Sequence, residues 1–205
     1  MTNFDFAFSP TVRAVQAERG ARDGYARRER ERDLGNSITP DIAAYLAAAN
    51  SAYLGTVSAD GQPYIQHRGG PAGFLRVVDD RTIGFADYVG NRQFITTGNL
   101  ADNPKAFLFV MDYVNRRRLK IWGVARTTRD PDEIAPLIID ADYPAKIEQA
   151  ILFRINAWDR NCPQHIPQMF PATDVAAVVQ ELQQRNAALE AELAALRNEH
   201  ASAAG

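Results

Sequence analysis

The sequence has a single cysteine, Cys162, among its 205 residues, so no disulfide can form within one chain. It has no run of about 18 apolar residues, which argues against a transmembrane helix. The first ten residues lack a basic segment followed by an apolar core, so we expect no secretory signal. Together these absences favour a reducing, cytoplasmic location.

The sequence also lacks an excess of charge of one sign. Its 23 Lys and Arg residues nearly balance 25 Asp and Glu residues, for a net charge of -2. Acidic and basic residues alternate even in the charged run 27–33. We therefore expect no nucleic-acid or membrane partner, and any bound anion must be held by a local cluster of cations.

A glycine-rich phosphate loop between a strand and a helix is absent, which disfavours a Rossmann fold. Short apolar segments separated by turn residues are present instead, and Asp60-Gly61 is a strong hairpin signal. Helices are expected at 11–18, 42–49, 93–97 and 132–140. Strands are expected at 53–58, 62–68, 74–78, 82–87, 105–111, 117–127 and 150–158. This pattern predicts a mainly β (α+β) fold, an antiparallel barrel with flanking helices.

The C-terminal segment 173–205 carries a heptad repeat. One seam position is filled by Val175, Leu182, Leu189 and Leu196, and the other by Val179, Asn186, Leu193 and His200. The pattern predicts a homodimeric coiled coil, and Asn186 favours a parallel pair. The alternative is an amphipathic helix packed on its own domain.

Cations near the ends of predicted strands are candidate ligands for a nucleotide phosphate. They are Arg68, Arg92 and Lys120. Gly90 and Asn91 precede the predicted short helix, whose N-terminus would attract a phosphate. The alternative is that these are ordinary surface cations.

The segments 85–92 and 99–104 resemble the pyridoxamine 5'-phosphate oxidase-like FMN-binding split-barrel family. Arg92 matches a basic phosphate ligand of that family, and Gly90 and Asn91 stand where the family has Ser and Arg. The strand Arg118-Leu119-Lys120-Ile121-Trp122-Gly123 resembles a family strand in which Arg118 replaces a glutamine that reaches the flavin from the second subunit. Arg68 fits an earlier phosphate-binding strand of the family.

The resemblance covers roughly residues 40–128. The segment 161–166 and the N-terminus are also similar to the predicted flavin-nucleotide-binding subgroup. The family resemblance implies a homodimer of antiparallel split β-barrels with FMN bound in the interface. It also implies hydride transfer at the FMN, with a small-molecule substrate or NAD(P)H as the partner. We therefore expect an N-terminal helical arm at 1–40, an FMN-binding domain at 41–172 and a coiled-coil helix at 173–205.

The resemblance leaves the reaction open, and no catalytic residue is assigned. The chain lacks the Arg- and Trp-rich segment that closes over the vitamin phosphate in genuine pyridoxamine phosphate oxidases, which argues against that substrate. A non-catalytic flavin-binding or sensing protein is the main alternative. Haem held by His67 or His165, and a deazaflavin cofactor, are further alternatives.

Cys162 and His165 lie three residues apart, and three interpretations of them stay open. They could form a structural turn between Pro163 and Pro167, lie beside the flavin, or bind a metal. Two ligands make a poor zinc site, so no metal is expected.

Overall fold

The computed structural model describes residues 2–140, 142–160 and 163–203. The chain forms two compact units, of which the first holds residues 1–112 with 116–165. The second holds residues 113–115 with 166–205. Each unit is described below by itself.

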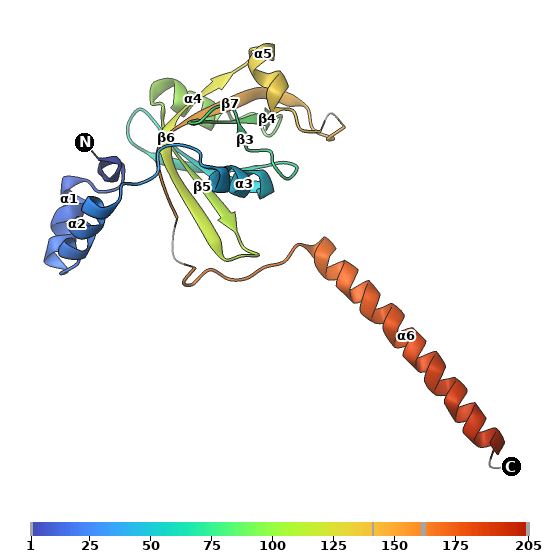
Figure 1. The fold of residues 1–205 in the computed structure, drawn as a ribbon. Coiled ribbons are helices and arrows are strands. Elements are labelled where there is room, and N and C mark those ends of the chain that lie inside the picture. The colour runs from blue at the N-terminus through green and yellow to red at the C-terminus, as the bar shows by residue number, and fades with distance from the viewer. Residues whose placement is uncertain (1, 141, 161–162, 204–205) are drawn as a thin grey trace. The chain divides into compact units, whose positions relative to one another are not determined.

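The first unit is built on one seven-stranded antiparallel sheet in the order β2-β1-β5-β6-β7-β4-β3. Figure 1 labels β3, β4, β5, β6 and β7 of this sheet. The strands are β1 (Ser51–Val57), β2 (Pro63–Gly69), β3 (Arg76–Val77), β4 (Thr82–Tyr88), β5 (Lys105–Asp112), β6 (Arg117–Thr128) and β7 (Ile147–Arg160). This sheet confirms the predicted mainly β, antiparallel split-barrel fold.

Turn chemistry sets the first hairpin. Gly61 has a φ of +92°, a conformation that glycine adopts without strain, and it closes the turn between β1 and β2. The register then pairs Ser51 with Gly69 and Val57 with Pro63. The Asp60-Gly61 signal therefore fixes which residues of β2 share a face.

The core lies on one face of the curved sheet. Alternate residues of the central strands are fully buried, among them Leu108 on β5, Ile121 on β6 and Phe153 on β7. Helix α3 (Pro40–Ala48) adds Ile42 and Leu46 to the same core. Burying a large aliphatic or aromatic side chain stabilises a fold by about 1.5–3 kcal/mol, so this cluster holds the barrel together.

Helices and 3₁₀ turns flank the sheet. Besides α3, they are η1 (Asn3–Phe6), α1 (Pro10–Glu18), α2 (Arg22–Glu31), α4 (Ile95–Asp102), α5 (Pro131–Ile134) and η2 (Ala135–Leu137), whereas α6 (Ala172–Ala203) belongs to the second unit. Asn99 of α4 donates to Thr56 of β1 at 3.0 Å, and both side chains are buried. This contact anchors α4 against the sheet.

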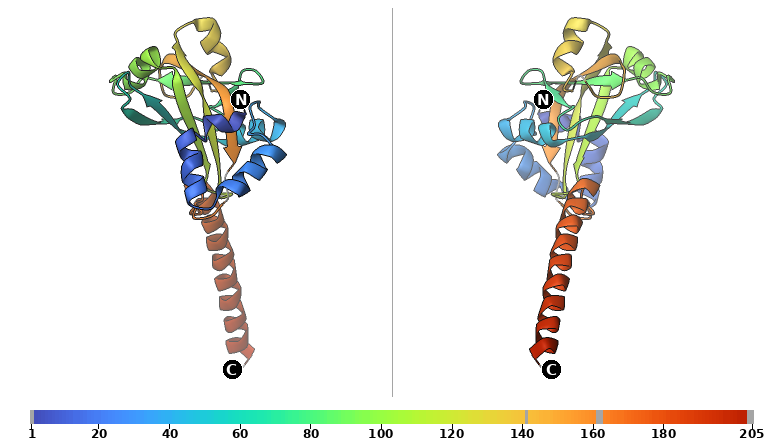
Figure 2. Two further views of the ribbon diagram at one scale, coloured as in Figure 1. Left: turned by 90° about the vertical axis from the view of Figure 1, so that its left-hand side faces the viewer. Right: turned by 90° about the vertical axis from the view of Figure 1, so that its right-hand side faces the viewer.

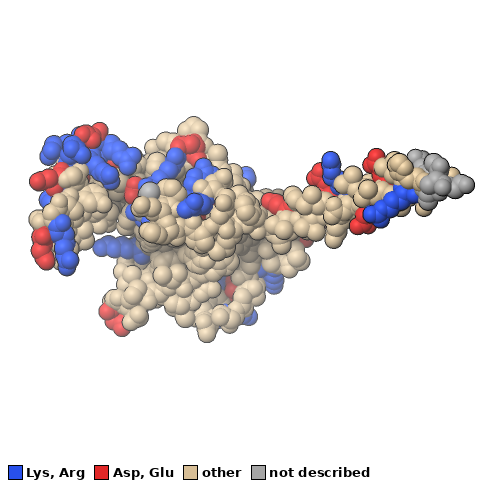
Figure 3. Space-filling model, turned by 90° about the horizontal axis from the view of Figure 1, so that it is seen from below, with Lys and Arg blue, Asp and Glu red and all other residues tan. Residues whose placement is uncertain are grey.

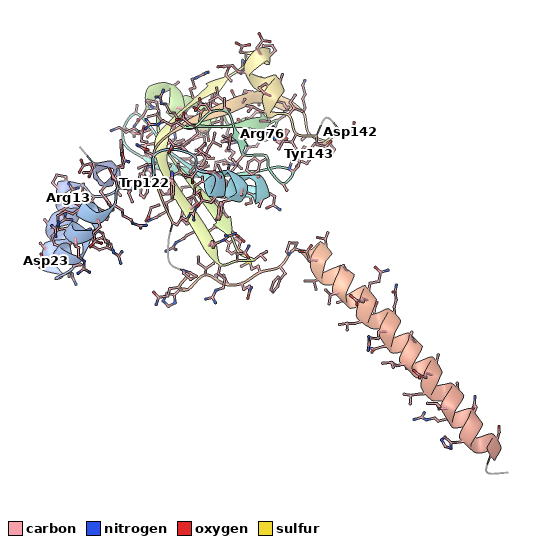
Figure 4. All side chains as sticks on the ribbon, viewed as in Figure 1. Arg13, Asp23, Arg76, Trp122, Asp142 and Tyr143 are labelled. Atoms are coloured by element: carbon pink, nitrogen blue, oxygen red, sulfur yellow. The ribbon has the colours of Figure 1, made fainter. Side chains whose placement is uncertain are left out.

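The N-terminal helices α1 and α2 lie side by side (Figure 2). Phe4 of η1 is buried with Ala157, and Trp122 packs against them; Figure 4 shows Trp122 next to the arm. Arg22 and Glu29 form a two-pronged ion pair at 2.8 Å. Acidic and basic side chains intermingle over this arm in Figure 3, so it presents no field of one sign.

Several element bounds differ from the sequence expectation. Helix α4 begins at Ile95 rather than at residue 93, because Arg92 and Phe94 both adopt positive φ. The strand expected at 74–78 is reduced to β3, because the Phe74 N–H donates to the carbonyl of Pro71 in a turn rather than to a neighbouring strand. The helix expected at 132–140 splits into α5 and η2, whose 3₁₀ turn contains a proline.

The second unit carries α6, a helix of 32 residues that confirms the predicted C-terminal helix. Gln168 donates to the carbonyl of Val114 at 2.9 Å, which ties the segment before α6 to residues 113–115. None of the helices in the described ranges is long and apolar enough to cross a membrane.

Candidate functional site

A hollow opens in the first unit between β2, the end of β4 and the start of α4. It is lined by Tyr64, Gln66 and Arg68 of β2, by residues 87–88 and 90–97, and by residues 148–149 of β7. Its volume is about 180 Å³. Small-molecule sites typically measure roughly 300–1,000 Å³. One chain therefore encloses less space than a nucleotide-sized ligand fills.

The floor of the hollow is a hydrogen-bonded network around Arg68. Its guanidinium donates to Asp87 Oδ1 at 2.5 Å and to Thr96 Oγ1 at 3.0 Å. Gln149 Nε2 donates to Asp87 Oδ2 and to Thr97 Oγ1, both at 2.9 Å. Arg68 Nε is buried and has no hydrogen-bond partner among the described residues. The network fixes the guanidinium and leaves one of its donors unused.

The rim of the hollow carries the more exposed cation. The Arg92 side chain is 66% exposed, and its Nη2 lies 3.5 Å from Glu148 Oε1. Its guanidinium also lies 5.8 Å from the centre of the Phe94 ring. An ion pair this long and this exposed contributes little stability, so Arg92 is available to another anion.

The start of α4 faces the same hollow. Phe94, the residue before the helix, has φ 53° and offers no side-chain cap. The first helical N–H groups have no partner within a helix, and the first α-helical bond here runs from Gly98 N to Phe94 O. These N–H groups and the positive end of the helix dipole favour an anion.

Charge in the hollow is balanced. Two cations, Arg68 and Arg92, stand against two carboxylates, Asp87 and Glu148. Net attraction for an anion must therefore come from donor placement and from the backbone of residues 90–97. A bound dianion would take the place of the Glu148 carboxylate as the partner of Arg92.

Tyr64 and Tyr88 complete the wall of the hollow. Burial raises the pKa of Tyr88, and nearby Tyr143 and Asp140 raise it further. The ring centres of Tyr88 and Tyr143 lie 5.1 Å apart, and Figure 4 labels Tyr143. Tyr64 donates its hydroxyl proton to Gln66 at 2.5 Å. At neutral pH the Tyr88 phenol thus stays protonated and can donate a hydrogen bond.

The structure brings together half of the candidate site residues proposed from the sequence. Arg68, Gly90, Asn91 and Arg92 all line the hollow, whereas Arg118, Lys120 and His165 do not. His165 is exposed with φ 62°. Cys162 lies outside the described residues, so its role stays a prediction.

Arg118 and Lys120 lie on the face of the sheet opposite the core. Lys120 pairs with Asp159 at 3.0 Å, and its ammonium lies 5.3 Å from the Trp122 ring centre. Arg118 Nε is buried and has no hydrogen-bond partner within the described chain.

Aromatic side chains extend this outer face. Phe107 contacts Phe109 with ring centres 6.3 Å apart and Trp122 at 5.2 Å. Tyr53 pairs with Phe109 across β1 and β5, and its side chain is 36% exposed. We call Tyr53, Phe107, Phe109 and Trp122 the outer-face aromatics. They form a contiguous apolar surface beside two cations.

Sequence reasoning missed the residues that hold the cations in place. Asp87, Thr96, Glu148 and Gln149 were not among the candidates. The signal for Asp87 was local, since it is a carboxylate at the last position of the expected strand 82–87. Glu148 and Gln149 had no local signal, because only the pairing of β4 with β7 brings them there.

Comparison with known proteins places this site in a family context. The family model described as pyridoxamine 5'-phosphate oxidase matches residues 38–166, more than half of the chain and the whole sheet. A search of curated proteins found no match.

Solved structures match this chain at low sequence identity. HupZ of Group A Streptococcus is 17% identical, with a TM-score of 0.50 over 65% of this chain and 99% of that chain. A Clostridium acetobutylicum protein related to general stress protein 26, of the pyridoxinephosphate oxidase family, is 17% identical over 64% of this chain and 92% of its own, with a TM-score of 0.45. An F420 reductase is 21% identical over 57% and 94%, with a TM-score of 0.41. At 17% identity the likeness to HupZ extends to the fold alone.

Proposed function

Because the chain belongs to the pyridoxamine 5'-phosphate oxidase family, we propose that it is a homodimeric FMN-dependent oxidoreductase with its cofactor in this hollow. The observation that carries the proposal is the convergence of Arg68, Arg92 and the uncapped start of α4 on one hollow within the matched region. A phosphate monoester is bound by charge-assisted hydrogen bonds from cationic side chains and by backbone N–H groups at a helix N-terminus.

The residues present fit the phosphate end of FMN. Arg68 offers a buried Nε that no described residue engages. Arg92 offers an exposed guanidinium whose only described carboxylate, that of Glu148, is 3.5 Å away. The N–H groups at the start of α4 would complete the shell, in the way that helix N-termini bind phosphates elsewhere.

The flavin ring would extend from the hollow toward a second subunit. One chain encloses only about 180 Å³, so a partner must supply further walls. The outer-face aromatics are a suitable contact surface, because aromatic residues are enriched in interfaces. In this arrangement the partner brings its own Arg118 and Lys120 toward the ring, and Cys162 and His165 are candidates for its edge.

FMN, when bound, supplies the reversible acceptance and release of a hydride, and the protein supplies binding and orientation. Arg68 and Arg92 would hold the phosphate, while Tyr64 and Gln66 offer hydroxyl and amide groups along β2. The protonated Tyr88 would act as a hydrogen-bond donor at the wall. A small-molecule substrate and NADH or NADPH are the candidate redox partners.

The first experiment is the visible absorption spectrum of the purified protein, with mass spectrometry of the released cofactor. The two visible bands of oxidised flavin, together with the mass of FMN, would support the cofactor assignment. A protein that stays colourless after incubation with FMN would refute it. A mass matching a deazaflavin or haem would replace FMN with that group.

A second experiment separates an enzyme from a non-catalytic flavin-binding or sensing protein. The FMN-loaded protein is mixed anaerobically with NADH or NADPH, and bleaching of the flavin band is followed. Bleaching many times faster than that of free FMN supports the oxidoreductase. A rate equal to that of free FMN, with both donors, favours the binding protein.

A further inference from the structure

Helix α6 presents a stripe of large apolar side chains that nothing in its own unit covers. The stripe consists of Val175, Val179, Leu182, Leu189, Leu193 and Leu196, whose exposed fractions lie between 45% and 54%. Burying a leucine side chain is worth about 1.5–3 kcal/mol. A stripe of this size on one helix marks an interaction surface.

The spacing of the stripe selects a helix as the partner. With Asn186 included, the seam residues alternate in steps of four and three along α6, from Val175 to Leu196. With His200 the repeat spans 26 residues, or about 39 Å at a rise of about 1.5 Å per residue. A narrow seam with a period of 3.5 residues fits a second helix at a shallow angle, whereas packing against a sheet favours a wider face.

We infer that α6 pairs with α6 of a second copy of this chain as a parallel, in-register, two-stranded coiled coil. Val179, Asn186, Leu193 and His200 occupy the a positions, and Val175, Leu182, Leu189 and Leu196 occupy the d positions. Leucine at d in a parallel dimer packs each side chain against its own copy.

Asn186 sets the direction of the pair. In a parallel in-register dimer the two Asn186 side chains meet in one layer, where each amide can bond the other. In an antiparallel pair an a position faces a d position, so Asn186 would face a leucine and lose its partner. A buried amide without a hydrogen bond costs about 1–3 kcal/mol, which favours the parallel form.

Charges beside the seam agree with a partner of the same sequence. In the parallel dimer Arg185 lies opposite Glu190 of the second copy, and Glu192 lies opposite Arg197. Each pair occurs twice by symmetry, and all are opposite in sign. Figure 3 shows charged side chains of both signs along α6.

Cysteine cross-linking of the full-length chain tests the direction and the partner together. In Leu193→Cys the two new thiols would meet at one a layer, whereas in the matched control Ala191→Cys they would lie on opposite outer faces. The unaltered chain, with Cys162 as its only cysteine, gives the baseline. Under mild oxidation we expect most Leu193→Cys chains to form a covalent dimer, and Ala191→Cys to stay at the baseline.

A second pair of variants tests the seam itself. Leu189→Glu places a charge in the seam, and Ala191→Glu places the same charge on the outer face. We expect Leu189→Glu to abolish the Leu193→Cys cross-link and Ala191→Glu to preserve it. The inference would be overturned if Leu193→Cys formed no cross-link. It would also be overturned if Leu193→Cys cross-linked only with a Leu182→Cys chain, because an a position faces a d position in an antiparallel pair. Neither measurement depends on a bound cofactor, so its outcome is separate from that of the FMN proposal.

Discussion

The hollow makes a prediction in which two neighbouring substitutions have opposite signs. Arg92 and Glu148 form a loose pair at its rim, with 3.5 Å between Nη2 and Oε1. If the FMN phosphate takes the place of Glu148 beside Arg92, Arg92→Ala removes an attraction. Glu148→Gln removes a repulsion and keeps the size of the side chain. We therefore expect Arg92→Ala to weaken FMN binding and Glu148→Gln to strengthen it.

The magnitudes follow from exposure and charge. A hydrogen bond to a charged group contributes about 1.5–3 kcal/mol, and screening of an exposed Arg92 reduces this to about 1–1.5 kcal/mol. The Kd for FMN should rise roughly 5- to 12-fold in Arg92→Ala. For an assumed separation of about 7 Å between the Glu148 carboxylate and a phosphate charge of about -1.5 to -2, the repulsion in a water-like dielectric is about 1 kcal/mol. Glu148→Gln should therefore lower the Kd roughly fivefold at low salt.

Salt dependence gives an internal check. The Debye length is about 8 Å at 0.15 M ionic strength, so screening should reduce the gain in Glu148→Gln to about twofold. The loss in Arg92→Ala should shrink less, because that contact is direct.

The assay is a titration of cofactor-free protein with FMN and with riboflavin, followed by flavin fluorescence at low and physiological salt. Riboflavin has the same ring and no phosphate, so both variants should bind it with the affinity of the unaltered protein. Equal losses for FMN and riboflavin in Arg92→Ala would refute the assignment of Arg92 to the phosphate. A weaker FMN complex in Glu148→Gln would refute the displacement of Glu148.

Three further predictions concern other parts of the chain. Gly35→Ala should lower the free energy of unfolding, measured by urea denaturation, by about 1–3 kcal/mol, because an added methyl group would overlap the Trp158 ring. Gly24→Ala, which adds a methyl group in open space on α2, is the control. The Glu133 carboxyl should titrate with a pKa of about 2, because Arg126 and Thr128 hydrogen-bond it. The contribution of the Glu133 carboxylate to stability should be complete above its ordinary pKa of 4.5 and be lost as the pH falls toward 2. In Arg126→Ala, an NMR titration should show a higher pKa for Glu133. An unchanged pKa would contradict the role of Arg126. Deleting residues 173–205 should leave a dimer that still binds FMN, as measured by sedimentation and flavin absorption; a monomeric product without flavin would show that α6 holds the site together.

Local signals in the sequence predicted most of the sheet. Asp60-Gly61 gave the β1–β2 hairpin, and partly alternating apolar and polar residues gave β7, whose observed bounds are Ile147–Arg160. These features depend on residues close in sequence, where turn chemistry and a period of two suffice. The repeat of leucines gave α6 for the same reason.

The loop before α4 was not predictable in the same way. Arg92 and Phe94 adopt left-handed backbone conformations that are uncommon for residues with a side chain, and no sequence pattern marks them. The partners of Arg68 were also hidden, because Asp87 and Thr96 reach it only through the curvature of the sheet. The sequence therefore pointed to the two arginines of the hollow but not to the carboxylates of Asp87 and Glu148 that pair with them.

The position of the Arg68 network explains why the hollow forms where the barrel is split. Strands β2 and β3 are the two edges of the sheet, and β3 pairs with β4 only at Ile83 and Gly84. Within the described residues, β2 makes no backbone ladder with β4. The bond from Arg68 to Asp87 links these strands through side chains instead, and the space left between them is the hollow.

Arg68 should consequently serve both the fold and the ligand, and Arg68→Lys separates the two roles. Lysine keeps the charge but lacks the planar fork that spans Asp87 and Thr96. We expect the cofactor-free variant to lose about 1–3 kcal/mol of stability, which lowers the melting temperature by roughly 2–12 °C. FMN should also raise that temperature by less than it does in the unaltered protein. An unchanged melting temperature without FMN would show that the bond to Asp87 does not close the split, and that the two strands are held there by the core alone.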